Sequence, residues 1–228
     1  MNKLSKNYVN LPFKREFLKS SSKIYVQNFL YQEKKRKSDL IEIHNRPSYI
    51  KILNSKLKNK VTFGDYKLAD IPNTCKSAIK AVSDLNFNYI TIHISSGLDA
   101  LKAAKKVSGK TKLTGVTILT SLNDKALKEI GFNKNVKKLV YQQAKLANKA
   151  KLDAIVCSAQ EVGIVRKVFR KEIITPGIRF NSKFNDQKRV LTPKQAYKNG
   201  SDWLVIGRPI TKGNIKKNIK KLIDHLNR

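Results

Sequence analysis

The sequence has few cysteines and no long apolar run, and both shortages exclude classes of protein. Only Cys75 and Cys157 occur in 228 residues, too few for a disulfide framework or a cysteine-based metal centre. No apolar run approaches the roughly 18 to 20 residues that a membrane span needs. The N-terminus has basic residues but no compact apolar segment with a small-residue cleavage site, so we expect no secretory signal. These features favour a reducing, cytoplasmic setting and no membrane partner.

Acidic residues are also scarce. The chain has 16 Asp and Glu against 48 Lys and Arg, which gives a net charge of +32. Such an excess invites a nucleic-acid interpretation. However, the basic residues are spread along the chain, with 15 Lys and Arg against 4 Asp and Glu in residues 1–60. No nucleic-acid-binding signature is recognisable. We expect a basic surface that attracts anionic, phosphorylated ligands, and no specific nucleic-acid partner.

From residue 61 onward, short apolar runs alternate with segments of helical spacing. The predicted strands are 61–63, 89–94, 113–119, 154–157, 173–175 and 203–206. The predicted helices are 74–85, 98–107, 124–130, 134–150, 160–169, 192–199 and 214–226. This alternation indicates parallel strands joined by right-handed crossovers. Before residue 61 no period is clear, and the candidate strands there are 23–30, 38–44 and 49–53.

Six strand–helix units, with room for two more before them, predict an α/β fold. The specific expectation is a (β/α)8 TIM barrel whose first two βα units are divergent or incomplete. An open doubly wound sheet is the alternative, but no G-x-G-x-x-G follows any predicted strand. We expect a divergent N-terminal segment over 1–60, partly disordered or supplying strands 1 and 2, and a barrel over 61–228.

Residues 63–74, F-G-D-Y-K-L-A-D-I-P-N-T, place two carboxylates and one ammonium within six positions. Residues two apart on a strand point to the same side. Asp65 and Lys67 should therefore project together from a strand end, with Asp70 in the following loop. Taken alone, a surface ion pair is the better explanation. In a barrel, however, the chemistry lies at the carboxyl ends of the strands, which here also carry His93, Thr117, Thr120, Cys157 and Ser158.

Two late strand ends carry a glycine close to an arginine, in 176–179 and 207–208. A glycine after a strand lets the backbone approach a ligand closely. Backbone N–H groups beside an arginine are a usual phosphate site of barrels. Arg179 and Arg208 therefore predict a phosphate-binding edge, although each glycine alone could be a plain turn.

These segments together resemble the orotidine 5′-phosphate decarboxylase family. Residues 63–74 resemble its signature F-x-D-x-K-x-x-D-I-P-N-T. The agreement continues in order through T-I-H at 91–93 with S-G at 96–97, G-V-T-I-L-T-S at 115–121, T-P-G-I-R at 175–179, D-Q-K-R at 186–189 and I-G-R-P-I-T at 206–211. It runs from about residue 55 to the C-terminus. D-x-K-x-x-D alone also resembles sugar-phosphate decarboxylases of the same barrel superfamily, whereas I-P-N-T, T-P-G-I-R and D-Q make the resemblance specific.

The resemblance implies decarboxylation of orotidine 5′-monophosphate to UMP and CO2, the last step of de novo pyrimidine nucleotide synthesis. It implies no metal and no organic cofactor. Lys67 would give a proton to C6 of the pyrimidine, and Asp65 would hold Lys67 in place. In a homodimer, Asp70 would complete the partner's site, with Ile71 and Thr74 beside it.

For substrate binding, the resemblance assigns the phosphate to Gln187, Arg208 and the backbone at Gly207. Arg179 matches the arginine that opens the family's phosphate-covering loop, and Thr120 matches a residue near the pyrimidine. The N-terminal quarter departs from the family pattern, because it has neither the A-L-D nor the K-x-G motif. Lys51 is the nearest equivalent of the second motif.

Three other functions stay open at this point. A non-catalytic relative that binds UMP or another phosphorylated ligand would explain the divergent N-terminus. A sugar-phosphate decarboxylase would share D-x-K-x-x-D, and a nucleic-acid-binding protein would share only the charge.

Overall fold

The structure, a computed structural model, describes residues 23–25, 61–83, 85–180 and 189–227. Its centre is a seven-stranded sheet in the order β1-β7-β6-β5-β4-β3-β2, in which every pair of neighbours is parallel. The strands are β1 Lys23–Tyr25, β2 Phe63–Leu68, β3 Tyr89–His93, β4 Lys112–Val116, β5 Ala154–Val156, β6 Glu172–Thr175 and β7 Trp203–Val205. Since β2 to β7 follow one another in chain order and β1 lies beside β7, the order is that of a barrel.

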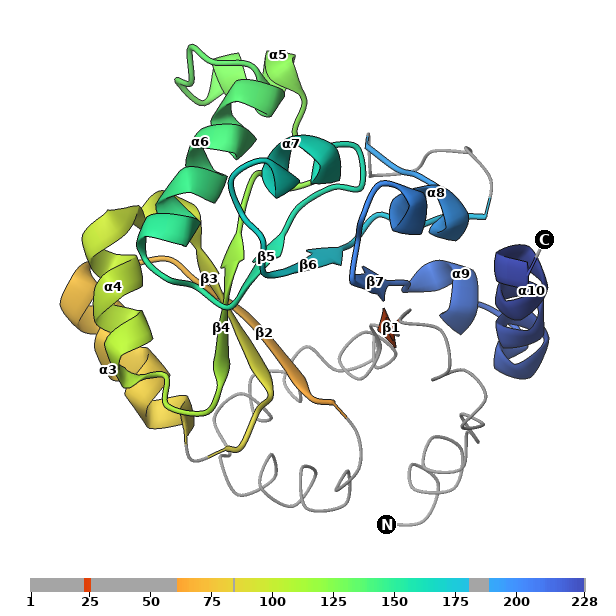
Figure 1. Ribbon diagram of the computed structural model, residues 1–228, viewed down its shortest axis with the longest axis horizontal. Coiled ribbons are helices and arrows are strands. Elements are labelled where there is room, and N and C mark those ends of the chain that lie inside the picture. Colours follow the sequence, from red (N-terminus) through yellow and green to blue (C-terminus); the bar gives the residue numbers. More distant parts are fainter. Residues whose placement is uncertain (1–22, 26–60, 84, 181–188, 228) are drawn as a thin grey trace.

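Helices follow the strands and line the outside of the sheet in chain order (Figure 1). They are α3 Pro72–Ser83, η2 Ile94–Ser96, α4 Gly97–Val107, α5 Asp124–Glu129, α6 Val136–Lys149, α7 Val162–Arg166, α8 Pro193–Lys198, α9 Arg208–Thr211 and α10 Ile215–Asn227. The predicted alternation from residue 61 is confirmed. Within the described ranges, no helix is both long enough and apolar enough to cross a membrane.

Some predicted boundaries were wrong. The strand predicted over 61–63 begins at Phe63 and continues to Leu68, so β2 includes both Asp65 and Lys67. The helix predicted over 160–169 shortens to α7, and neither η2 nor α9 was predicted. β1 lies inside the candidate strand 23–30. The other two candidates, 38–44 and 49–53, fall outside the described residues.

The two faces of the sheet bury different side chains, as the alternation of residues along a strand requires. Ile90, Ile155 and Ile173 face the helices and pack in the largest apolar cluster. Their neighbours in sequence, Tyr89, Ala154 and Ile174, form a separate cluster on the inner face with Trp203 and Val205. Among the described residues, these side chains fill the inner face, so the strand ends are where a ligand can bind.

Gly115 on β4 shows how closely the outer face packs. A Cβ atom at this position would lie 2.8 Å from Ile94 Cδ1 and 2.8 Å from Leu152 Cδ1. Real Cβ atoms do not approach heavy atoms so closely, so β4 can lie against these side chains only because residue 115 has none.

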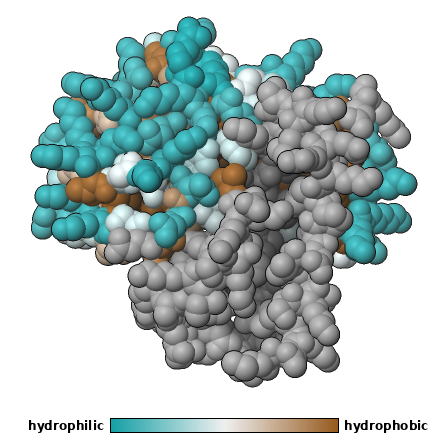
Figure 2. All heavy atoms as spheres, turned by 60° about the horizontal axis from the view of Figure 1, so that its bottom comes forward, coloured by the Kyte–Doolittle hydropathy of each residue, from teal (hydrophilic) through white to brown (hydrophobic). Residues whose placement is uncertain are grey.

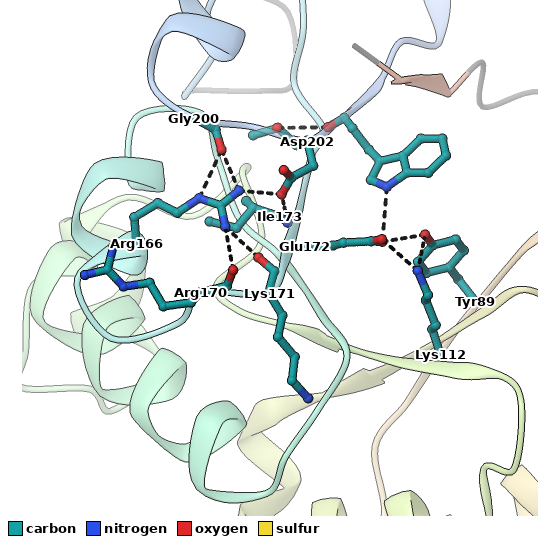
Figure 3. A network of polar contacts seen from close by, with 11 residues as sticks. Tyr89, Lys112, Arg166, Arg170, Lys171, Glu172, Ile173, Gly200 and Asp202 are labelled. Atoms are coloured by element: carbon teal, nitrogen blue, oxygen red, sulfur yellow. Dashed lines mark hydrogen bonds and ion pairs between the residues drawn. The ribbon is translucent and has the colours of Figure 1, made fainter. Parts of the chain in front are cut away.

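The amino ends of the strands are closed by charged groups, shown in Figure 3. Glu172, the first residue of β6, accepts hydrogen bonds from Tyr89, from Lys112 Nζ at 2.7 Å and from Trp203 Nε1 at 3.2 Å. Burial raises the pKa of the Glu172 carboxyl, but these donors and the charge of Lys112 outweigh burial and hold the pKa below its ordinary value. In barrels this end serves stability.

Figure 2 shows one side of the molecule, on which the surface of the described residues is mostly hydrophilic, with scattered apolar residues between the polar ones. This agrees with the distribution of lysine along the chain, since most of the lysines on the described helices are exposed. Exposed large apolar side chains are few among the described residues: Val61, Ile71, Leu119, Ile130 and Phe132.

Candidate active site

Asp65, Lys67 and Thr91 form the polar centre of the carboxyl edge of the sheet. Lys67 Nζ and the Asp65 carboxylate form an ion pair. Thr91 Oγ1 donates a hydrogen bond to Asp65 Oδ1 at 3.0 Å and accepts one from the Lys67 backbone N–H at 2.8 Å. Asp65 and Lys67 therefore project to the same side of β2, as their spacing predicts. Thr91, which is fully buried on β3, holds both of them.

The backbone of β2 is irregular at this point. The register with β3 shifts between Gly64 and Leu68, and Lys67 has a φ of 49°, a left-handed conformation that non-glycine residues seldom adopt. Its N–H group bonds to the Thr91 side chain in place of a backbone carbonyl. Bulges and unusual backbone conformations are common at functional sites, where they hold a side chain in a particular orientation. Here the outlier is Lys67 itself, whose ammonium pairs with Asp65 and whose side chain is 42% exposed.

His93, at the end of β3, interacts electrostatically with both Lys67 and Asp65. The side chain is half-buried. Burial lowers the pKa of the imidazole and the positive charge of Lys67 lowers it further, while Asp65 opposes both. Both the burial and the charge of Lys67 therefore favour the neutral imidazole over the imidazolium at this position.

Asp70, Ile71 and Thr74 lie next to this centre but point to solvent. Asp70 is exposed in the bend before α3, and its Oδ1 accepts a hydrogen bond from the Ile71 N–H at 2.7 Å. Between the described residues Asp70 and Lys67 there is no ion pair within one subunit. Ile71 is 66% exposed, and Thr74 is exposed on the first turn of α3. Within one chain, the structure does not bring the second carboxylate of the motif to the ammonium.

The residues assigned to substrate lie along the same edge. Thr120 is half-buried in the connection after β4, and Gly207 lies between β7 and α9, where its carbonyl accepts from the Ile210 N–H at 2.9 Å. Arg208 is exposed on α9. Arg179 follows β6 and donates through its backbone N–H to the Leu191 carbonyl at 3.0 Å. Lys51 and Gln187 fall outside the described residues.

Sequence reasoning missed two features of this edge. The first is Thr91, which was noted only as part of T-I-H. The second is a buried ion pair between Glu161 and Arg189, whose nearest N–O distance is 2.8 Å. Burial raises the pKa of Glu161, and the Arg189 guanidinium opposes that rise. Neither Thr91 nor the pair follows from a local pattern, because each contact joins separate strands or loops.

No group of three or more His, Cys, Asp or Glu side chains suited to a metal ion occurs among the residues that the structure describes. Both cysteines are free and buried, and burial raises the pKa of the Cys157 thiol, mainly by desolvation.

Comparison with known proteins gives a consistent result. The family model described as orotidine 5′-phosphate decarboxylase / HUMPS family matches residues 35–221. An orotidine 5′-phosphate decarboxylase of Wolbachia sp. subsp. Brugia malayi is 47% identical over 169 residues, which cover 72% of this chain and 75% of that protein. One of Ehrlichia chaffeensis is 49% identical over 154 residues, covering 65% and 67%.

Solved structures agree with the sequence matches. The crystal structure of orotidine 5′-phosphate decarboxylase from Lactobacillus acidophilus superposes with a TM-score of 0.71 at 26% identity, over 91% of this chain and 99% of that one. The Methanocaldococcus jannaschii enzyme complexed with the inhibitor BMP gives a TM-score of 0.62 at 24% identity, over 79% and 81%. The predicted TIM-barrel fold class is thus confirmed, and the chain belongs to the orotidine 5′-phosphate decarboxylase / HUMPS family.

Proposed function

We propose that this chain decarboxylates orotidine 5′-monophosphate to UMP and CO2, the last step of de novo pyrimidine nucleotide synthesis. The observation that carries the proposal is the Lys67–Asp65 pair, held by Thr91 at the carboxyl edge of the sheet. Relatives of this chain that are 47% and 49% identical are orotidine 5′-phosphate decarboxylases. Because both cysteines are free, we also propose a reducing, cytoplasmic location.

Lys67 suits both halves of the reaction. When the bond between C6 and the carboxylate breaks, the electron pair stays on C6 and CO2 leaves. A fixed ammonium stabilises the carbanion that develops, and the same group then transfers a proton to C6. Lys67 regains its proton from water. Asp65 holds the ammonium in place, and Thr91 fixes both the Asp65 carboxylate and the Lys67 backbone. The reaction as written requires no oxidant, reductant or further cofactor.

We propose that the active form is a homodimer in which Asp70 completes the partner's site. Asp70, Ile71 and Thr74 are exposed beside the Asp65–Lys67 pair, and Ile71 is a large apolar side chain that is 66% exposed. A second copy would cover Ile71 and place a carboxylate near Lys67. The exposed apolar residue beside an unused carboxylate supports this arrangement.

We propose that the phosphate lies against Arg208, Arg179 and the backbone at Gly207, with Thr120 toward the pyrimidine. The described members of this set lie in the connections after β4, β6 and β7, so they share one edge of the sheet. Backbone N–H groups with an arginine are suited to a phosphate dianion. Gln187 belongs to the proposed phosphate set, and Lys51 is the nearest equivalent of the family's upstream lysine; both remain predictions, since they lie outside the described residues.

Replacement of Lys67 tests the function directly. Purified protein should consume orotidine 5′-monophosphate, measured by its absorbance, and Lys67→Ala should lower turnover by about a thousandfold or more because it removes both the charge and the proton. UMP affinity, measured by calorimetry, should change little. Lys106→Ala, on the exposed side of α4, is the matched control and should behave as wild type.

Near-wild-type turnover of Lys67→Ala would refute the assigned role of the ammonium. A wild-type protein that binds UMP without any turnover would instead be a non-catalytic relative, and the proposed function would be wrong.

A further inference from the structure

Glu161 and Arg189 form a buried ion pair that none of the roles above uses. Arg189 Nη1 lies 2.8 Å from Glu161 Oε1, and the two side chains are only 8% and 2% exposed. Taking both charges out of water is costly, and apolar residues of similar volume often serve stability as well. Stability alone does not account for this pair, and its role lies in the loops that Arg189 connects.

The second arm of Arg189 reaches the loop after β4. Nη2 donates to the Ile118 carbonyl at 2.9 Å and to the Leu119 carbonyl at 2.8 Å. These two residues directly precede Thr120, which is proposed to lie toward the pyrimidine. A guanidinium presents its donors in a rigid planar fork, so it can hold a carboxylate and two carbonyls together. Glu161 thus orients the fork, and the fork fixes the backbone before Thr120.

The backbone of Arg189 belongs to the connection between β6 and α8, on the phosphate side. Its carbonyl accepts a hydrogen bond from Ser158 Oγ at 3.3 Å. Two residues further on, Leu191 accepts from the Arg179 N–H at 3.0 Å and pairs with Ile178. The start and the end of this connection are therefore tied together beside Arg179, and Arg189 links them to the loop after β4.

We propose that Arg189, oriented by Glu161, is a positioning residue that makes the phosphate side and the pyrimidine side of the substrate site one rigid unit. The inference rests on the proposed function. Its consequence is that interactions made with the phosphate help to place the pyrimidine against Lys67. Loss of the Arg189 fork should then reduce the advantage in turnover that the substrate gains from its phosphate.

Arg189→Lys tests this, because a lysine can keep the charge beside Glu161 but cannot hold both carbonyls. The measured quantity is kcat/KM for orotidine 5′-monophosphate divided by kcat/KM for orotidine, which lacks the phosphate. We expect this ratio to fall by about tenfold in the variant. A variant that merely folded less well would lower both values equally and leave their ratio unchanged.

Arg166→Lys is the matched control. Arg166 also joins separate loops through a fork, donating to the Gly200 carbonyl at 2.7 Å and to the Lys171 carbonyl at 2.6 Å, with Asp202 as its ion-pair partner (Figure 3). It lies at the amino ends of β6 and β7, away from the proposed site. This variant should lose thermal stability and keep the wild-type ratio.

Glu161→Gln gives a second route, because it removes the carboxylate that orients Arg189 and should lower the ratio in the same direction. A ratio within twofold of wild type in whichever of the two variants folds would overturn the inference. If the wild type showed no turnover, the proposed function would fail separately. The ratio of UMP to uridine affinities, measured by calorimetry, would then test the positioning role in its place, and an unchanged ratio in the variants would again overturn it.

Discussion

Thr91 holds the Asp65–Lys67 pair with one hydroxyl, which donates to Asp65 and accepts from the Lys67 backbone. Thr91→Val keeps the shape and leaves both partners without that contact. An unmade hydrogen bond at a buried position costs about 1–3 kcal/mol, so we expect kcat to fall by about 10- to 100-fold. Steady-state turnover of orotidine 5′-monophosphate measures this effect.

Thr91→Ser is the control for the same position, since it keeps the hydroxyl and loses only a methyl group. Its kcat should stay within about threefold of wild type, because the hydrogen bonds are retained. Equal loss of kcat in both variants would show that the methyl packing matters and that the hydroxyl does not.

Gly115 gives a prediction about stability. Since a Cβ atom would lie 2.8 Å from Ile94 and from Leu152, Gly115→Ala should destabilise the fold by about 1–3 kcal/mol, and lower Tm by about 2–10 °C for a chain of this size. Gly163→Ala, where nothing lies within 4 Å of the added atom, should be neutral or slightly stabilising. Differential scanning calorimetry compares them, and equal Tm values would contradict the packing argument.

The elements show what local sequence can and cannot predict. β3 and the helices α4 and α6 were predicted close to their observed bounds because their apolar spacing matches a strand or a helix, whereas β4 ends three residues before its predicted end at 119. β2 was predicted too short because Asp65 and Lys67 interrupt its apolar run, and only their contacts with Thr91 explain charged residues inside a strand. α9 spans four residues and has no period to detect.

The candidate site shows the same division between contacts that local sequence predicts and contacts that it does not. The pair Asp65 and Lys67 follows from a spacing of two residues on one strand. The Glu161–Arg189 pair does not, because its members are 28 positions apart and meet only when the loops after β5 and β6 are brought together. Sequence therefore indicated the Asp65–Lys67 pair, and the tertiary structure was needed to identify Thr91, which holds the pair, and the Glu161–Arg189 contact.

The amino ends of β3, β4, β6 and β7 meet at Glu172, and this contact predicts a pH dependence. In the folded protein the pKa of the Glu172 carboxyl lies below its ordinary value of 4.5. The native contacts therefore stabilise the ionised carboxylate more than the protonated acid. The stabilisation is complete above the unfolded pKa and is lost as the pH falls through the lower, folded pKa. At acidic pH the wild type should therefore lose the part of its folding stability that the ionised Glu172 provides.

Glu172→Gln isolates that effect. At pH 7 its Tm should lie about 2–6 °C below wild type, since hydrogen bonds to a charged group are lost. As the pH is lowered below 4.5, the difference between the two proteins should shrink, as measured by thermal unfolding at each pH. Glu129→Gln, at the exposed end of α5, should show no such convergence. A Tm difference that stays constant from pH 7 to pH 3 would refute the linkage.

For the whole molecule, the position of Asp70 predicts that a complete site needs two chains. Lys67 and Asp65 lie in one chain, while Asp70 of the same chain is exposed and makes no ion pair with Lys67. If Asp70 serves the partner's site, Lys67→Ala and Asp70→Ala should each be inactive alone. In a mixed dimer, the site that contains the intact Lys67 also receives the intact Asp70, whereas the other site lacks both.

Mixing the two variants one to one, with unfolding and refolding to exchange subunits, should therefore restore activity. Random pairing makes half of the dimers mixed, and each mixed dimer has one complete site of two, so about one quarter of wild-type activity is expected. Each variant refolded alone is the control and should stay inactive. Activity that failed to return in a mixture shown to contain mixed dimers would mean that Asp70 acts within its own chain, and the proposed shared site would be wrong.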